Sequence, residues 1–170
     1  MKLILGFVVG LLVLPVCAYF YVKAGMAPVA TSAPPLPFER WAARTALHVR
    51  IDKEMPKESP VAANDATYLA GAHVYRTNCA VCHGLPGQPQ TGLSKGMFPD
   101  VPQLWKHGVD DDPPGETYWK VANGIRLTGM PGFKGALTDE QMWQVSQMLA
   151  NAPKLPPPVM DLLKQPLHVE

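Results

Sequence analysis

The chain begins with one long run of apolar positions. It extends from Leu3 to Val22, is interrupted only by glycines, Pro15 and one thiol, and has a lysine on each side. A helix that rises about 1.5 Å per residue would carry this run across roughly 30 Å, the thickness of a bilayer's hydrocarbon core. The pattern therefore predicts an N-terminal transmembrane anchor over residues 1–23. The alternative is a secretory signal peptide that is cleaved near residues 16–18.

Apolar positions return at helical spacing in the middle of the chain, at i, i+4, i+7 and i+11, which places them on one helix face. They are Tyr68, Ala72, Tyr75 and Cys79. Asn64 or Asp65 precedes them and is a favourable N-cap residue. This segment is therefore predicted to be the first helix of a compact domain.

Two further helices are indicated by the residues at their ends. A helix is expected over residues 115–122, because Asn123-Gly124 supplies a left-handed stop. The last helix should begin after Thr138, where Gln141 completes a capping box, and should end near Asn151. No segment shows the alternation of a β-strand over a useful length. The domain is therefore predicted to be all-α.

The 19 prolines concentrate after the apolar run and near the C-terminus. Proline-rich segments form extended spacers rather than core. We therefore expect a tether over residues 24–63, a compact domain over 64–152 and a proline-rich tail over 153–170. Within the tether, helical spacing of apolar residues over 38–47 predicts a short helix that packs on the domain or binds a partner.

Charge and cysteine content narrow the classes of function. The chain has 15 Lys and Arg residues against 14 Asp and Glu residues, so no strong overall field attracts it to nucleic acid. Its three cysteines, Cys17, Cys79 and Cys82, cannot form a disulfide framework, and the close pair must serve a local site. Cys17 lies in the apolar run and is expected to be an inert thiol.

The residues Cys79-Ala80-Val81-Cys82-His83 form a C-x-x-C-H motif, the spacing of c-type haem attachment. Two thiols one helical turn apart can each bond a haem vinyl group, and the adjacent histidine then lies beneath the iron. A zinc site would need a second pair of ligands, which the sequence lacks, and a thioredoxin-like dithiol belongs beside a βαβ unit. We predict one haem c, bound covalently by Cys79 and Cys82, with His83 as an axial iron ligand.

A methionine is the expected sixth ligand, because methionine raises the reduction potential in c-type cytochromes. Met130 follows His83 by 47 positions, which leaves enough chain to wrap the porphyrin. Gly129 before it allows a close backbone approach, and Pro131 after it stiffens the turn. Met97 follows the histidine by only 14 positions. Met130 is therefore predicted to be the second axial ligand.

Other side chains could compete for the iron. Met142 and Met148 lie on the expected last helix and are predicted to fill the core. His73 or His107 could give a haem with two histidine ligands. We expect His73 to lie off the buried face of the first helix and His107 to lie in a solvated loop, so neither is preferred.

These features together resemble a class I cytochrome c over about residues 64–151. They are Gly71, Tyr75, the C-x-x-C-H motif, the Gly129-Met130-Pro131 loop and the helix with Trp143. The resemblance implies a cytochrome c fold of three to four helices, in which the first and last helices cross near Gly71. It also implies that His83 donates a hydrogen bond to a backbone carbonyl in the region 84–102. Residues 97–104 are similar to membrane-bound bacterial cytochromes, some of which are subunits of terminal oxidases or dehydrogenases.

The expected function is single-electron transfer between redox proteins or within a membrane oxidoreductase complex, without a small-molecule substrate and without enzymatic activity. The alternatives are the electron-transfer subunit of a larger oxidase or dehydrogenase and, in another class, a haem-based gas or redox sensor. The resemblance implies that haem is attached outside the bacterial cytoplasmic membrane. The haem domain is therefore expected on the periplasmic side, with residue 1 in the cytoplasm.

Overall fold

The computed structural model describes residues 2–107 and 111–167 of the chain. In these ranges all regular elements are helices, joined by turns and loops with one isolated bridge. The prediction of an all-α fold is therefore confirmed. The chain divides into two compact units, Met1–Arg40 and Trp41–Glu170, and each is described by itself.

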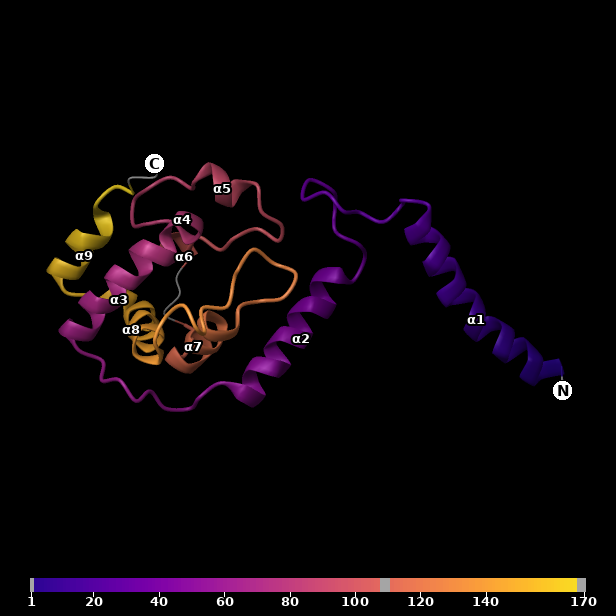
Figure 1. Cartoon of the computed structure of the whole chain (residues 1–170), viewed down its shortest axis with the longest axis horizontal. Helices are drawn as coiled ribbons and strands as arrows, with labels where there is room; N and C mark the ends of the chain where they lie inside the picture. Colours follow the sequence, from indigo (N-terminus) through magenta and orange to yellow (C-terminus); the bar gives the residue numbers. More distant parts are fainter. Residues whose placement is uncertain (1, 108–110, 168–170) are drawn as a thin grey trace. The chain divides into compact units, whose positions relative to one another are not determined.

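The first unit is built on α1 (Lys2–Lys23), which corresponds to the apolar run of the sequence (Figure 1). The stretch Gly6–Lys23 has a mean hydropathy of 1.9, and none of it is buried. By length and composition, the helix can therefore cross a membrane. After α1 the chain passes through turns in which most side chains are exposed.

The second unit packs around α3 (Asp65–Asn78), α7 (Pro114–Asn123) and α8 (Asp139–Ala150). α8 contacts both of the other helices, and the three share one apolar core (Figure 1). The side chains buried at its centre include Tyr75, Val121, Met142, Val145 and Met148. In the described residues between α3 and α7, the chain forms three short helices: α4 (Ala80–His83), α5 (Gly92–Lys95) and α6 (Leu104–His107).

The crossing of α3 and α8 depends on a glycine. A Cβ added at Gly71 would collide with the backbone carbonyl of Gln144 and would lie 2.9 Å from the Cβ of Met148. The missing side chain thus lets the two helices approach closely at this point. The crossing near Gly71, which the resemblance implied, is present in the structure.

The helix ends follow the capping residues of the sequence. The Asn64 side chain accepts a hydrogen bond from the Thr67 backbone N–H at 3.0 Å, which caps α3. Thr138 and Gln141 form a reciprocal capping box at the start of α8. Gly124, with a φ of 67°, ends α7. All three predicted helices are therefore confirmed, within two residues of their expected limits.

The C-terminal tail contributes to the core, so the expectation of a spacer over 153–170 is wrong for its central part. After a short 3-10 helix (Ala152–Lys154), residues Pro157–Lys164 form α9, which packs on α3. Val159 and Leu163 of α9 are 1% and 0% exposed. Of the prolines that predict a spacer, Pro157 and Pro158 stand in the first turn of this helix, where no backbone N–H is needed, and Pro156 is its N-cap.

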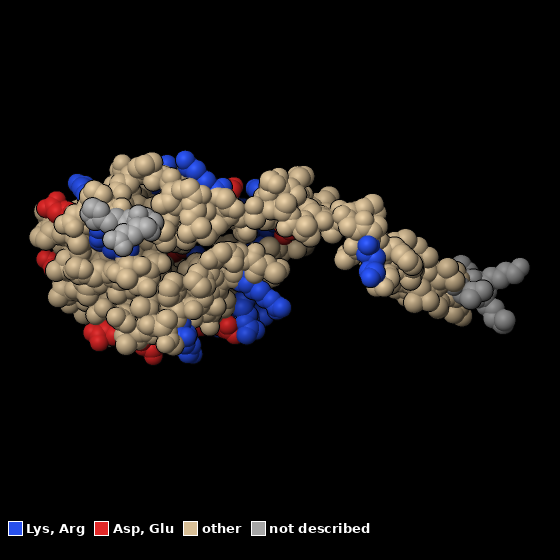
Figure 2. Space-filling model, turned by 45° about the horizontal axis from the view of Figure 1, so that its top comes forward, with Lys and Arg blue, Asp and Glu red and all other residues tan. Residues whose placement is uncertain are grey.

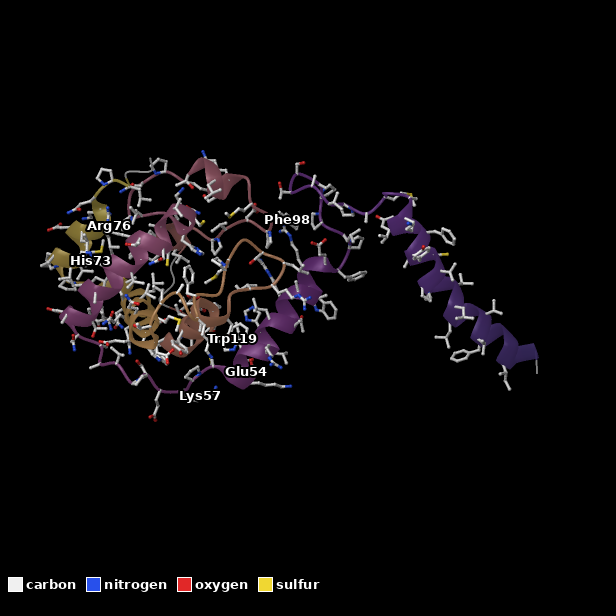
Figure 3. The ribbon with its side chains drawn as sticks, viewed as in Figure 1. Glu54, Lys57, His73, Arg76, Phe98 and Trp119 are labelled. Carbon is white, nitrogen blue, oxygen red and sulfur yellow. The ribbon has the colours of Figure 1, made fainter. Side chains whose placement is uncertain are left out.

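Two side chains from the haem-motif region bind the end of α9. Arg76 of α3 donates from its guanidinium to the carbonyls of Leu162 at 2.9 Å and Gln165 at 2.7 Å (Figure 3). The Gln88 amide donates to the carbonyls of Lys164 and Gln165, both at 3.1 Å. These bonds add partners for carbonyls at the end of the helix, of which that of Leu162 also accepts from the Gln165 backbone N–H.

α2 (Glu39–Glu54) is longer than the short helix expected in the tether. Ile51 is 1% exposed, and the Glu54 carboxylate accepts a hydrogen bond from the indole N–H of Trp119 at 3.2 Å (Figure 3). The compact unit therefore begins within α2, at Trp41, rather than near residue 64.

Charged side chains of both signs are spread over the visible face of the protein, between large neutral areas (Figure 2). One small cluster lies on α7, where the Lys120 Nζ is 2.6 Å from an Asp112 oxygen and 2.7 Å from a Glu116 oxygen. Burial disfavours the charged amine, but the bonds to the two carboxylates outweigh this effect and raise the pKa of Lys120.

Candidate haem-binding site

The C-x-x-C-H motif forms a single helical turn at the end of α3. Cys79 is the junction residue, at which α3 ends and α4 begins. Its carbonyl accepts hydrogen bonds from the backbone N–H groups of Cys82 at 3.1 Å and His83 at 2.9 Å. Gly84 then ends α4 with a φ of 77°, a conformation that favours glycine. The five motif residues thus form one compact turn, in which Cys79 and Cys82 are one helical turn apart.

Neither motif thiol forms a disulfide within the described part of the chain. Burial raises the pKa of the Cys79 thiol to about 12, and the neighbouring Cys82 adds to this increase. Burial also raises the pKa of Cys82. Both groups are therefore protonated thiols at neutral pH, unlike the low-pKa thiolates of redox dithiols.

The imidazole of His83 is held in one orientation. Its Nδ1 lies 2.9 Å from the carbonyl oxygen of Pro102. Because a carbonyl only accepts, Nδ1 carries the proton, and the lone pair of Nε2 is free to bind a metal. Burial lowers the pKa of His83, although the bond to Pro102 opposes part of this effect. The carbonyl that the resemblance placed in the region 84–102 is that of Pro102.

Met130 lies in the loop between α7 and α8, which folds back on itself. The Ile125 N–H donates to the Met130 carbonyl at 3.1 Å, and the Met130 N–H donates to the Thr128 hydroxyl at 3.1 Å. A Cβ added at Gly124 would lie 2.5 Å from the backbone nitrogen of Gly132. Glycine at this position therefore allows the loop to close, and Met130 is held half-buried against the core.

The other candidate ligands are placed elsewhere. Met142 and Met148 are 1% and 0% exposed on α8, so they fill the core as predicted. His73 is exposed on α3, which agrees with its expected position off the buried face (Figure 3). The side chain of His107 lies outside the described residues. None of the three described side chains competes with Met130.

Met97 has a position that the sequence spacing did not indicate. A Cβ added at Gly129 would lie 2.9 Å from the Met97 sulfur and 3.4 Å from its methyl carbon. The Met97 thioether therefore occupies the space that the glycine leaves open, and it packs directly against the loop that carries Met130. Chain separation gives no sign of this contact, because it depends on the path of two loops.

The sequence gives no sign of three side chains that hold the backbone carbonyls around α4, two of them directly and one through another side chain. They are Thr91, Gln103 and Trp105, the last acting through the hydroxyl of Tyr75. The sequence places Tyr75 on the buried face of its helix but gives no partner for its hydroxyl. No spacing rule identifies such bonds, because the carbonyl that a side chain reaches is set by the tertiary path of the chain.

The arrangement fits a covalently attached haem. The motif turn, Cys79 together with α4, presents two thiols one turn apart and an imidazole with a free Nε2, while Cys79 and Met130 pack against the same core. By contrast, no group of three or more His, Cys, Asp or Glu residues in the described ranges could hold a metal ion. The geometry therefore gives no support to the zinc alternative.

Comparisons with known proteins agree with this geometry. The family described as cytochrome C oxidase, cbb3-type, subunit III matches residues 66–147. Cytochrome c6 of Limnospira maxima is 34% identical over 77 residues, which are 45% of this chain and 83% of the relative. Cytochrome c550 of Pseudomonas aeruginosa is 31% identical over 99 residues, 55% of this chain and 61% of the relative. The cbb3-type cytochrome c oxidase subunit FixP of Sinorhizobium medicae is 35% identical over 104 residues, 51% of this chain but 32% of the relative.

The family match extends from the start of α3 into α8 and therefore coincides with the helices that surround the motif turn. The match to cytochrome c6 covers most of that relative, whereas the chain spans less than two thirds of the other two. On this evidence the chain belongs to the monohaem c-type cytochromes, electron carriers with one covalently bound haem c.

Proposed function

We propose that Cys79 and Cys82 hold the haem c covalently, that His83 and Met130 are the axial ligands, and that the protein passes single electrons between redox partners. The observation that carries this proposal is the α4 turn, in which two thiols precede an imidazole whose Nδ1 is bonded to Pro102. A bound haem supplies one-electron chemistry by alternating between ferric and ferrous iron.

The side chains of the chain then have distinct tasks. The bond from Nδ1 to Pro102 fixes the ring of His83 and increases the donor strength of Nε2. Met130 would supply a soft thioether ligand, which would favour the reduced state and leave no open coordination position for a gas or substrate. The half-buried loop around Met130 therefore supports a carrier rather than a gas sensor.

Mass spectrometry of the denatured protein tests the attachment. The parent should retain the mass of one haem under conditions that unfold it. Cys82→Ser should hold haem incompletely, whereas the control Cys17→Ser should keep it, because Cys17 lies on α1. Equal loss of haem from both variants would contradict the proposed roles, and a zinc-sized mass increment in the parent would refute the assignment.

We further propose that α1 anchors the protein in the cytoplasmic membrane, with the haem domain on the periplasmic side. The length and apolar character of α1 support the anchor, and the FixP relative is described as an oxidase subunit. The mature protein should sediment with membranes, and external protease should cut the haem domain in spheroplasts. Protection from that protease would contradict the orientation, and an N-terminus near Tyr19 would instead indicate a cleaved signal peptide.

The family match supports a place as an electron-transfer subunit of a membrane oxidoreductase complex. Purification in mild detergent distinguishes this role from that of a free carrier. A complex subunit should co-purify in constant ratio with other haem or copper proteins. Recovery of the chain alone would favour a carrier that meets its redox partners transiently.

A further inference from the structure

α4 is so short that its own backbone cannot pair all of its carbonyls, since the last carbonyls of a helix lack intrahelical partners. Side chains from other segments bond to them instead. The Thr91 hydroxyl, at the start of α5, donates to the Val81 carbonyl at 2.6 Å. The Gln103 amide donates to the Cys82 carbonyl at 3.0 Å, and Gln103 is 8% exposed. The motif turn is thus held from outside through its carbonyl groups.

Tyr75 and Trp105 add a second connection. The hydroxyl of Tyr75, a fully buried residue of α3, donates to the Gly84 carbonyl at 2.7 Å. The indole N–H of Trp105, on α6, donates to that hydroxyl oxygen at 3.0 Å. The two rings also meet edge to face, with centroids 5.8 Å apart. A continuous chain of bonds therefore links α6 through α3 to the residue that follows His83.

Both sets of hydrogen bonds, those of Gln103 and that of Trp105, hold the residues that directly follow Pro102. Gln103 follows Pro102 directly and, besides its bond to α4, donates to the Val101 carbonyl at 3.3 Å. Trp105 lies three positions after Pro102 and is bonded to Tyr75. Gln103 and Trp105 therefore fix the position of the Pro102 carbonyl, which accepts the hydrogen bond from His83 Nδ1, without taking part in that hydrogen bond themselves.

We propose that Gln103 and Trp105 are positioning residues that aim the Pro102 carbonyl at His83 and thereby set the reduction potential of the bound haem. The inference rests on the proposed role of His83 as an axial ligand. A hydrogen bond donated from Nδ1 makes an imidazole a stronger electron donor, which favours ferric iron and lowers the potential. When the carbonyl is less well fixed, this bond weakens and the potential rises.

The test compares full-length, haem-loaded variants that lose one donor group each. Gln103→Met removes the amide bonds to the Cys82 and Val101 carbonyls, and Trp105→Phe removes the indole bond to Tyr75. Gln88→Met and Trp119→Phe are matched controls, because they remove the same donors from bonds to the end of α9 and to α2. The measurements are the reduction potential and, by NMR of the reduced protein, the solvent exchange of the His83 Nδ1 proton. Both test variants should show a higher potential and faster proton exchange, whereas both controls should match the parent.

Unchanged potential and unchanged proton exchange in the two test variants would overturn the inference. Equal shifts in the controls would overturn it too, because general loosening of the protein would then be the cause. If Gln103→Met does not fold, Trp105→Phe still decides the question, since phenylalanine preserves the aromatic packing against Tyr75. An NMR spectrum of the parent without an iron-bound His83 would refute the proposed function instead. If the parent spectrum shows an iron-bound His83 but the test variants keep the parent's potential and proton exchange, only this inference is refuted.

Discussion

Replacement of Gly124 by alanine tests how the loop that presents Met130 is held in place. Gly124 has a φ of 67° and a ψ of −176°, a region that is almost confined to glycine. A Cβ there would lie 2.5 Å from the nitrogen of Gly132, 2.7 Å from the carbonyl carbon of Pro131 and 2.9 Å from the Met130 oxygen. All three atoms belong to the backbone, so no change of side-chain rotamer can relieve the contacts.

The expected cost has two parts. The unfavourable backbone conformation costs about 1–3 kcal/mol, and overpacking against a fixed backbone adds about 1–3 kcal/mol. The free energy of unfolding of Gly124→Ala should therefore fall by about 3 kcal/mol, which lowers the melting temperature by roughly 10 °C for a unit of this size. Gly87→Ala is the control: Gly87 has a φ of 71°, but a Cβ there has no neighbour within 4 Å. Its cost should be only about 1–2 kcal/mol.

The assay is denaturant unfolding of the full-length, haem-loaded protein in detergent. Tryptophan fluorescence follows the fold, and the absorption band of sulfur-ligated ferric haem follows the Met130 ligand. Gly124→Ala should lose stability and part of the sulfur ligation, because the added methyl group pushes the loop outward. Gly87→Ala should lose a little stability and keep its ligation. Equal losses in the two variants, or full sulfur ligation in Gly124→Ala, would refute the reasoning.

Three further changes test other parts of the structure. Met130→Ala should lower the reduction potential and let the reduced protein bind carbon monoxide, whereas Met97→Ala should do neither; an effect in the Met97 variant alone would show that the ligand assignment is wrong. Leu163→Ala should lower the free energy of unfolding by about 3 kcal/mol, because the side chain is fully buried. Leu69→Ala, at 39% exposure, should change it by less than about 1 kcal/mol. A loss for Leu163→Ala as small as that for Leu69→Ala would place α9 outside the core. The pKa of Lys120 is higher in the folded protein than the ordinary value of 10.5. The stabilisation that charged Lys120 gives the folded state is therefore complete below pH 10.5 and is lost as the pH rises through the folded-state pKa. Lys120→Met should therefore lower the free energy of unfolding at about pH 8, as measured by urea unfolding, and should show a smaller further loss of stability near pH 11 than the parent. An alkaline loss of stability equal to that of the parent would show that Lys120 is not its cause.

Features that depend on neighbouring residues could be predicted from the sequence. The caps at Asn64, Thr138 and Gly124 fixed the limits of three helices, because each cap acts on backbone groups within one turn. The motif turn was equally local, since the spacing of Cys79 and Cys82 determines their separation once a helix forms. The roles of these thiols stay predictions until the attachment is measured.

Features that depend on the path of the loops could not be predicted. The resemblance implied an acceptor for His83 within a region of the chain, but only the tertiary path of that segment identifies it as the Pro102 carbonyl. The packing of Met97 against Gly129 likewise joins two loops that are distant along the chain. Neither contact leaves a periodic pattern, because each involves single residues in irregular segments.

The error in α9 has a different cause. A run of prolines predicts a spacer by composition, yet proline is well suited to the first turn of a helix, as Pro157 shows. The apolar spacing that follows, with Val159 and Leu163 four positions apart, was the available signal for a packed helix. In this segment the spacing of the apolar residues indicates the structure better than the proline content does.

The packing of α9 on α3 also constrains the order in which the protein can be completed. α3 leads directly into the motif turn, yet one of its faces is covered by residues from the end of the chain. That apolar face stays open to water until residues 157–167 have been synthesised and delivered to the same compartment. Newly made chains that lack this segment should therefore be especially prone to aggregation and proteolysis, even when every residue of the motif is already in place.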